Sequence, residues 1–83
     1  MTDRPPTVEL FGTRTCPYTA DAREHLLWNR VVFTEHDVEA DPSARARLAE
    51  LTGGRTLVPV VVEDGRVKEI GWRGRGCMVD GPG

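Results

Sequence analysis

The chain has 83 residues, 39% of them apolar and 29% charged, a composition typical of one small globular domain and unlike that of disordered or fibrous proteins. Eleven basic and 13 acidic residues leave a net charge of -2, so we expect neither nucleic acid nor a membrane surface as a partner. No stretch approaches the ~20 apolar residues that span a bilayer, and the first residues lack a basic segment followed by an apolar run. We therefore expect a cytoplasmic protein.

The first half of the chain predicts a strand, a helix and a second strand. Residues 7–11 alternate into a buried strand that ends at Gly12. Residues 17–29 are predicted to be helical, since Pro17 suits a first helical turn. That helix is expected to bury three apolar residues: Ala22, Leu26 and Leu27. Residues 31–36 are β-branched and apolar, which indicates the second strand.

The second half predicts another helix and two more strands. Asp41-Pro42 supplies a cap and a first-turn residue for the helix, which stops at Gly53-Gly54. It is expected to bury Ala44, Leu48 and Leu51. Residues 58–62 are predicted to form the third strand, with its proline at the beginning, and Asp64-Gly65 turns the chain into a fourth strand at residues 66–70.

This order of elements predicts an α/β fold with a four-stranded mixed sheet. A crossover helix joins the first two strands, which must therefore be parallel, whereas the hairpin makes the last two antiparallel. Residues 71–83 carry five glycines and a proline and do not have the pattern of a helix.

Cys16 lies between the end of the first strand and the first turn of a helix. Unpaired amides and the helix dipole favour negative charge there, so we expect its thiolate to be stabilised, with Arg14 as a neighbouring cation. The alternative is that Cys16 is a small buried apolar residue, as free cysteines often are.

The segment Cys16-Pro17-Tyr18-Thr19, preceded by a strand and followed by Val58-Pro59, resembles the glutaredoxin family over roughly residues 7–72. The resemblance implies a thioredoxin-like fold, without the family's usual C-terminal helix, and a thiol-disulfide oxidoreductase that uses glutathione as co-substrate. It implies that Cys16 attacks disulfides and that a cis Val58-Pro59 peptide lies against it. A trans proline opening an edge strand is the alternative.

The resemblance also implies a glutathione groove with several contributors, three of which have a structural alternative: Tyr18, Thr19 and Arg14. Tyr18 would shape the groove, or it is a half-exposed aromatic at a helix start. Thr19 replaces the second cysteine of dithiol members and cannot close a disulfide, and its alternative is a plain helix-turn residue. Arg14 would bind a glutathione carboxylate, or it is a solvated loop charge. Gly71 matches the family pattern, whereas Trp72 replaces a smaller residue.

Cys77 is the candidate resolving cysteine. The fourth strand returns toward the level of Pro59, and the six or seven residues from Ile70 to Cys77 span up to about 20 Å. The alternative is a tail cysteine that never meets Cys16. Together with Thr19, this glycine-rich ending resembles the glutaredoxin-like branch called Uxx-star.

We expect a single glutaredoxin-like domain, with its core at residues 7–72 and a flexible glycine-rich tail at residues 73–83. The predicted function is reduction of mixed disulfides or glutathionylated proteins, within electron transport and redox homeostasis. One alternative is a carrier of a [2Fe-2S] cluster in a glutathione-ligated dimer; others are an electron donor of the ribonucleotide-reductase redoxin type and a redox-inactive binding module.

Single histidines at positions 25 and 36 do not predict a metal site. A homodimer would cover sheet surface left bare by the missing terminal helix.

Overall fold

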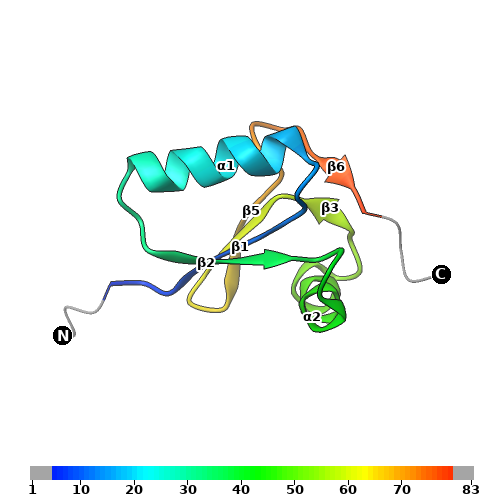
Figure 1. The fold of residues 1–83 in the computed structure, drawn as a ribbon. Helices are drawn as coiled ribbons and strands as arrows, with labels where there is room; N and C mark the ends of the chain where they lie inside the picture. Colours follow the sequence, from blue (N-terminus) through cyan, green and yellow to red (C-terminus); the bar gives the residue numbers. More distant parts are fainter. Residues whose placement is uncertain (1–4, 80–83) are drawn as a thin grey trace.

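The computed structural model describes residues 5–79. These residues form two helices and six strands (Figure 1), in the order β1 (Val8–Gly12), α1 (Pro17–Trp28), β2 (Phe33–Asp37), α2 (Pro42–Thr52), β3 (Leu57–Val58), β4 (Val60–Glu63), β5 (Arg66–Ile70) and β6 (Cys77–Met78). In this described part, neither helix has the length and apolar character needed to cross a membrane.

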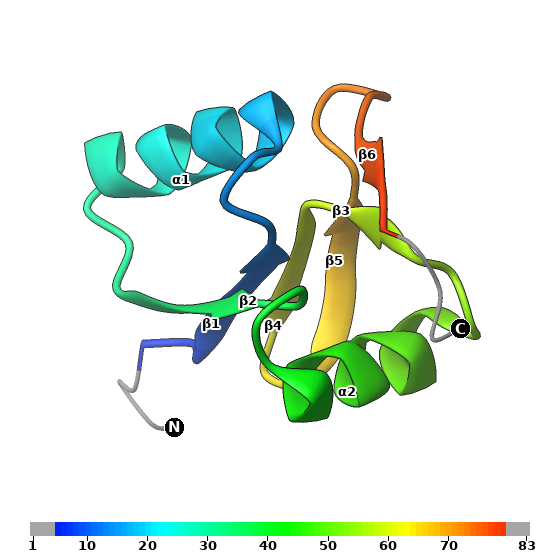
Figure 2. The same cartoon turned by 45° about the vertical axis from the view of Figure 1, so that its right-hand side comes forward.

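The main sheet has the strand order β2-β1-β4-β5 and is mixed, as predicted. β1 runs parallel to β2 and antiparallel to β4, and β4 runs antiparallel to β5. The helices lie on opposite faces of this sheet (Figures 1 and 2). Since both faces are covered, each of the five residues of β1 is buried.

Two apolar clusters correspond to the two faces of the sheet. The cluster beneath α1 contains Val8 and Leu10 of β1 together with Ala22 and Leu26 of the helix. The cluster on the other face joins Phe11 to residues of α2 and to those of β3 and β4; its buried members are Phe11, Cys16, Val38, Ala44, Leu48, Val58, Val60, Val62 and Val79. Alternation along β1 therefore divides its apolar residues between the two helices.

A charged cluster joins α2 to the same face of the sheet. Glu9 is 8% exposed and accepts hydrogen bonds from Arg47, while the Nε2 atom of His36 lies 2.9 Å from its Oε2 atom. The Arg47 guanidinium also lies over the Phe11 ring, 5.6 Å from its centroid. Hydrogen bonding from Arg47 is the main cause that holds the pKa of Glu9 below its ordinary value; burial opposes it and His36 adds to the lowering.

The predicted helix ends agree with the structure, whereas two predicted core residues differ: Leu51 is only partly buried and Leu27 is exposed. Pro17 is the first residue of α1, and the Asp41 side chain accepts hydrogen bonds from the first-turn amides of α2. Leu27, expected to be buried, is 59% exposed, since it lies beside Leu26 in sequence and so projects about 100° away from it on the helix. The second strand, predicted at residues 31–36, begins at Phe33 in the structure, and Val32 is 88% exposed.

The predicted third strand is two strands in two different sheets. Pro59 separates β3 from β4, because a residue without an N–H cannot continue the hydrogen-bond ladder. β4 belongs to the main sheet, whereas β3 pairs antiparallel with β6 in a small second sheet. The strand structure therefore begins at Leu57, one residue before the predicted start at residue 58.

The segment after β5 contains more structure than its glycine content indicated. Trp72 and Arg75 form an isolated bridge, and Cys77–Met78 form β6. The amide of Val79 extends the β3–β6 pairing with a hydrogen bond of 2.8 Å to the carbonyl of Thr56. Residues 77–79 of the expected flexible tail thus pair with β3, and residues 80–83 of that tail lie outside the described part of the chain.

Candidate active site

Cys16 occupies the N-cap position of α1. Its backbone is extended, with φ -80° and ψ 116°, and the first intrahelical hydrogen bond is donated by the Ala20 amide to the Cys16 carbonyl. Pro17 has no amide hydrogen, and the amides of Tyr18 and Thr19 precede that first bond. An N-cap side chain normally accepts hydrogen bonds from these two amides. In the oxidised structure the Cys16 side chain accepts no capping hydrogen bond, and the N-cap position is one at which the helix dipole favours a negative charge.

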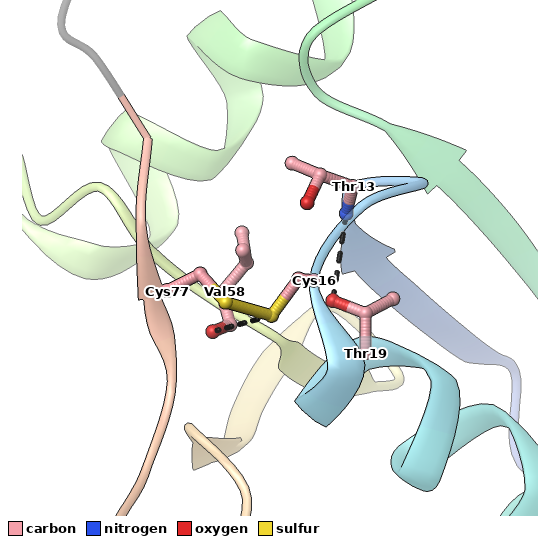
Figure 3. Close-up of a disulfide and its surroundings, with 5 residues drawn as sticks. All are labelled: Thr13, Cys16, Thr19, Val58 and Cys77. Atoms are coloured by element: carbon pink, nitrogen blue, oxygen red, sulfur yellow. Dashed lines mark hydrogen bonds between the residues drawn. A yellow bond between two sulfur atoms is a disulfide. The ribbon is translucent and has the colours of Figure 1, made fainter.

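Cys16 and Cys77 form a disulfide, although 61 residues separate them in sequence (Figure 3). Their Cα atoms are 6.0 Å apart, within the range that a disulfide requires. The interpretation of Cys77 as a tail cysteine that never meets Cys16 is therefore wrong. The pairing of β6 with β3 brings Cys77 to this place, directly opposite Val58.

Gly76 permits this close approach of β6 to β3. A Cβ atom on Gly76 would lie 2.5 Å from the Val58 carbonyl oxygen and 3.0 Å from a side-chain carbon of Leu57. Only a glycine leaves this space free. The glycine content of residues 71–83 argued only against a helix and gave Gly76 no role; its position directly before a cysteine is the signal that could have marked it.

Val58 and Pro59 lie against the disulfide. The peptide bond between them is cis, as the resemblance implied. The Val58 carbonyl oxygen is 4.0 Å from the Cys16 Sγ atom (Figure 3). A disulfide sulfur has no hydrogen to donate, so this distance describes a contact and not a hydrogen bond. The Pro59 carbonyl accepts a hydrogen bond of 2.6 Å from the Gly71 amide, which places Gly71 beside the cis Val58-Pro59 peptide.

The two cysteines differ in burial. Cys16 is 3% exposed and belongs to the cluster on the α2 face of the sheet, against which Tyr18 and Cys77 pack as partly buried residues. This burial is that of the oxidised state, in which the bond to Cys77 occupies the Cys16 sulfur. Chemistry at Cys16 with a large substrate therefore requires β6 to move or the disulfide to open.

Thr19, at the position of the second cysteine in dithiol glutaredoxins, faces away from the disulfide. Its side chain is fully buried, and its hydroxyl accepts a hydrogen bond of 3.4 Å from the Thr13 amide (Figure 3). A Cβ atom on Gly12 would overlap the Thr19 side chain. Thr19 thus joins the start of α1 to the end of β1 and so supports the loop that carries Cys16.

Two other predicted site residues lie away from the sulfur atoms. Trp72 is partly buried, packs against the cluster beneath α1, and its ring centroid is 5.2 Å from that of His25. Arg14 is exposed and lines a surface hollow together with Asp37 and Glu39. Of the predicted residues, the structure therefore gathers Cys16, Cys77, Tyr18, Val58, Pro59 and Gly71, and leaves Arg14, Thr19 and Trp72 in neighbouring structure.

The loop before Cys77 is basic. Arg73 and Arg75 are exposed, and residues 71–78 contain no acidic side chain. Within residues 5–79 neither arginine takes part in a salt bridge, and Arg73 lies over the Trp72 ring at 5.4 Å from its centroid. In the same described range, no group of three or more His, Cys, Asp or Glu side chains has the arrangement of a metal site.

Comparison with known proteins gives a consistent set of relatives. Residues 8–68 match the family model described as Glutaredoxin. A curated protein from Synechocystis, described as probable glutaredoxin slr1562, is 35% identical over 54 residues, which are 65% of this chain and 50% of that protein. The chain therefore spans about half the length of this curated relative.

Solved structures with the same arrangement are also found. A variant of the thioredoxin-like protein BC3987 superposes with a TM-score of 0.72 and 33% identity, covering 81% of this chain and 83% of that one. Glutaredoxin 1 from Francisella tularensis, crystallised with cacodylate, superposes with a TM-score of 0.57 over 81% of this chain and 84% of that one; at 21% identity it supports the fold alone.

Proposed function

Since this chain belongs to the glutaredoxin family and has a thioredoxin-like fold, we propose that it is a thiol-disulfide oxidoreductase in which Cys16 and Cys77 alternate between dithiol and disulfide. Its substrates are mixed disulfides, including glutathionylated proteins, in the cytoplasm. The observation that carries the proposal is the bond between Cys77 and a cysteine at the start of a helix.

The first step belongs to Cys16. Its thiolate attacks one sulfur of the substrate disulfide, so that a bond forms between Cys16 and that sulfur while the substrate S–S bond breaks. The departing thiolate takes a proton from solvent. The amides of Tyr18 and Thr19 stabilise the attacking thiolate at the N-cap position.

The second step belongs to Cys77. Its thiolate attacks the Cys16 sulfur of the mixed disulfide, expels the second substrate thiolate and closes the bond between Cys16 and Cys77. Two electrons have then passed from the two cysteines to the substrate. Cys77 thereby takes the role of the second motif cysteine, whose position holds Thr19 in this chain.

Glutathione is the proposed thiol that returns the protein to its dithiol form. Tyr18 packs against the cluster that contains Cys16, and Val58, Pro59 and Gly71 are buried beside it in the oxidised protein; these four residues are the proposed glutathione contacts. Arg73 and Arg75 carry the positive charge that suits its carboxylates. The Arg14 side chain lines a hollow with Asp37 and Glu39 and the Trp72 ring lies beside His25, so we assign neither a direct contact with glutathione.

A [2Fe-2S] cluster does not fit the oxidised site. The Cys16 sulfur is the ligand that the family resemblance assigns to such a cluster, and here it is bonded to Cys77. We therefore derive no step through a cluster.

The proposal is tested by turnover on a glutathionylated peptide with excess glutathione. Cys16→Ser is expected to lower the rate more than 100-fold, whereas Thr15→Ser, at an exposed neighbouring position, is the control and is expected to match the unsubstituted protein. Cys77→Ser is expected to retain turnover through a glutathione-resolved route but to form no intramolecular disulfide. Full activity of Cys16→Ser would end the proposal.

A further inference from the structure

The disulfide presents its two cysteines unequally to solvent. Cys16 is 3% exposed and is enclosed by the cluster on the α2 face of the sheet. Cys77 is partly exposed and belongs to a strand of two residues, whose second residue, Met78, is 76% exposed. A thiol arriving from solvent therefore meets Cys77 before Cys16.

The two cysteines are also unequal as leaving groups. Thiol-disulfide exchange is faster when the departing sulfur is the better stabilised thiolate. Cys16 departs into the N-cap position of α1, next to the unused amides of Tyr18 and Thr19. Cys77 departs from a strand, where no helix end assists it. The weak contact of the Cys16 sulfur with the Val58 carbonyl, at 4.0 Å, opposes this difference only slightly because it lies at the limit for a sulfur hydrogen bond.

From this asymmetry, and resting on the proposed function, we infer that the regenerating thiol attacks Cys77 and that Cys16 is the leaving group. The thiolate sulfur forms a bond to the Cys77 sulfur, the Cys16–Cys77 bond breaks, and Cys16 departs as a thiolate. A second thiolate then attacks the small-molecule sulfur of the mixed disulfide on Cys77. The products are one oxidised small-molecule disulfide and the Cys77 thiolate, which takes a proton from solvent.

The chain thus uses one cysteine to receive each kind of reactant. Cys16 receives the oxidised substrate and Cys77 receives the reductant, whereas attack of both at Cys16 would require the reductant to reach a buried sulfur. Arg73 and Arg75 are exposed on the loop that directly precedes Cys77, so the reductant that this loop favours is a small thiol that carries negative charge.

The attacked sulfur is identified by trapping the first mixed disulfide. The oxidised full chain is mixed with less than one equivalent of glutathione, quenched with acid within milliseconds, and treated with N-ethylmaleimide to label free thiols. Trypsin then places Cys16 in residues 15–23 and Cys77 in residues 76–83. We expect glutathione on Cys77 and maleimide on Cys16, in at least tenfold excess over the reverse arrangement.

A second measurement uses the two single-cysteine variants, each loaded with glutathione. Release of glutathione by a further equivalent of thiol is expected to be at least fivefold faster from Cys16 in Cys77→Ser than from Cys77 in Cys16→Ser, because the Cys16 thiolate is the better stabilised leaving group. Trapping of glutathione on Cys16 in the unsubstituted protein would overturn this inference and leave the proposed function standing. A disulfide that glutathione does not open would overturn both.

Discussion

Val58 and Cys77 lie directly opposite each other in the β3–β6 pairing, and this register places Cys77 beside the Cys16 sulfur. The same Val58 residue presents its carbonyl to that sulfur at 4.0 Å. A pairing of two residues per strand is too short to hold on its own. The disulfide and the β3–β6 pairing therefore stabilise each other.

Reduction of the disulfide should lower the stability of the protein. The bond closes a loop with a sequence separation of 61 residues, for which chain entropy gives a stabilisation of about 4 kcal/mol as an upper value. We expect a loss of about 2–4 kcal/mol in unfolding free energy, measured by urea denaturation with and without a strong reductant. The Cys77→Ser variant is the control, because its stability should not depend on the reductant.

Gly76→Ala should weaken the disulfide without changing Cys16 itself. The added Cβ atom would meet the Val58 carbonyl oxygen at 2.5 Å, and overpacking of this kind costs about 1–3 kcal/mol. In a glutathione redox buffer we expect the equilibrium between dithiol and disulfide to shift roughly tenfold toward dithiol, since 1.4 kcal/mol corresponds to tenfold. Met78→Ala, at the exposed neighbour of Cys77, should leave the equilibrium unchanged; an unchanged Gly76→Ala would show that β6 tolerates the side chain.

Thr19→Val should destabilise the loop that carries Cys16. Valine keeps the shape of the buried side chain but removes the acceptor for the Thr13 amide, at an expected cost of about 1–2 kcal/mol in unfolding free energy. Thr15→Val, at an exposed position, should change stability by less than about 0.5 kcal/mol. Denaturation of both variants in the oxidised state measures the difference, and equal stabilities would refute a supporting role for the Thr19 hydroxyl.

Glu9 should make the protein less stable in acid. Arg47 lowers the pKa of Glu9 in the folded protein, so Glu9 binds its proton more tightly in the unfolded chain. The stabilisation of the folded state by ionised Glu9 is therefore complete when the pH is above the pKa of Glu9 in the unfolded chain, near 4.5. This stabilisation is lost as the pH falls through the lower pKa of Glu9 in the folded protein. Glu9→Gln should remove this part of the pH dependence and cost about 1–2 kcal/mol at pH 7.

Melting temperatures measured between pH 3 and pH 7 test this expectation. Glu50→Gln, an exposed change on α2, is the matched control and should keep the pH dependence of the unsubstituted protein. If Glu9→Gln loses as much stability on acidification as the unsubstituted protein, the Glu9–Arg47 contact contributes nothing to it.

The double substitution Arg73→Gln and Arg75→Gln should slow opening of the disulfide by glutathione but not by 2-mercaptoethanol. The first thiol carries carboxylates and the second is uncharged, and exposed charge contacts are worth roughly a factor of two to five in rate. Arg66→Gln, on the exposed surface of β5, serves as the control. Stopped-flow rates at low and high salt are the measurement, and equal slowing with both thiols would contradict an electrostatic role.

Local sequence patterns, such as capping and turn residues, predict most of the secondary structure. Pro17 and Asp41 predict the helix starts, Asp64-Gly65 predicts the hairpin, and the position of Cys16 directly before Pro17 predicts a cysteine at a helix N-terminus. These features depend on backbone groups within a few residues of one another, so their physical cause is present in the local sequence.

Contacts between distant segments decided the remainder. The sequence showed that Cys77 was within reach of Cys16 but not that it would arrive, because that depends on β6 finding β3 and on the space left by Gly76. The division of the strand at Pro59 and the packing of Trp72 beside His25 likewise follow from partners far along the chain. A residue's neighbours in sequence specify its backbone conformation, whereas only the folded arrangement specifies which sulfur, carbonyl or ring it meets.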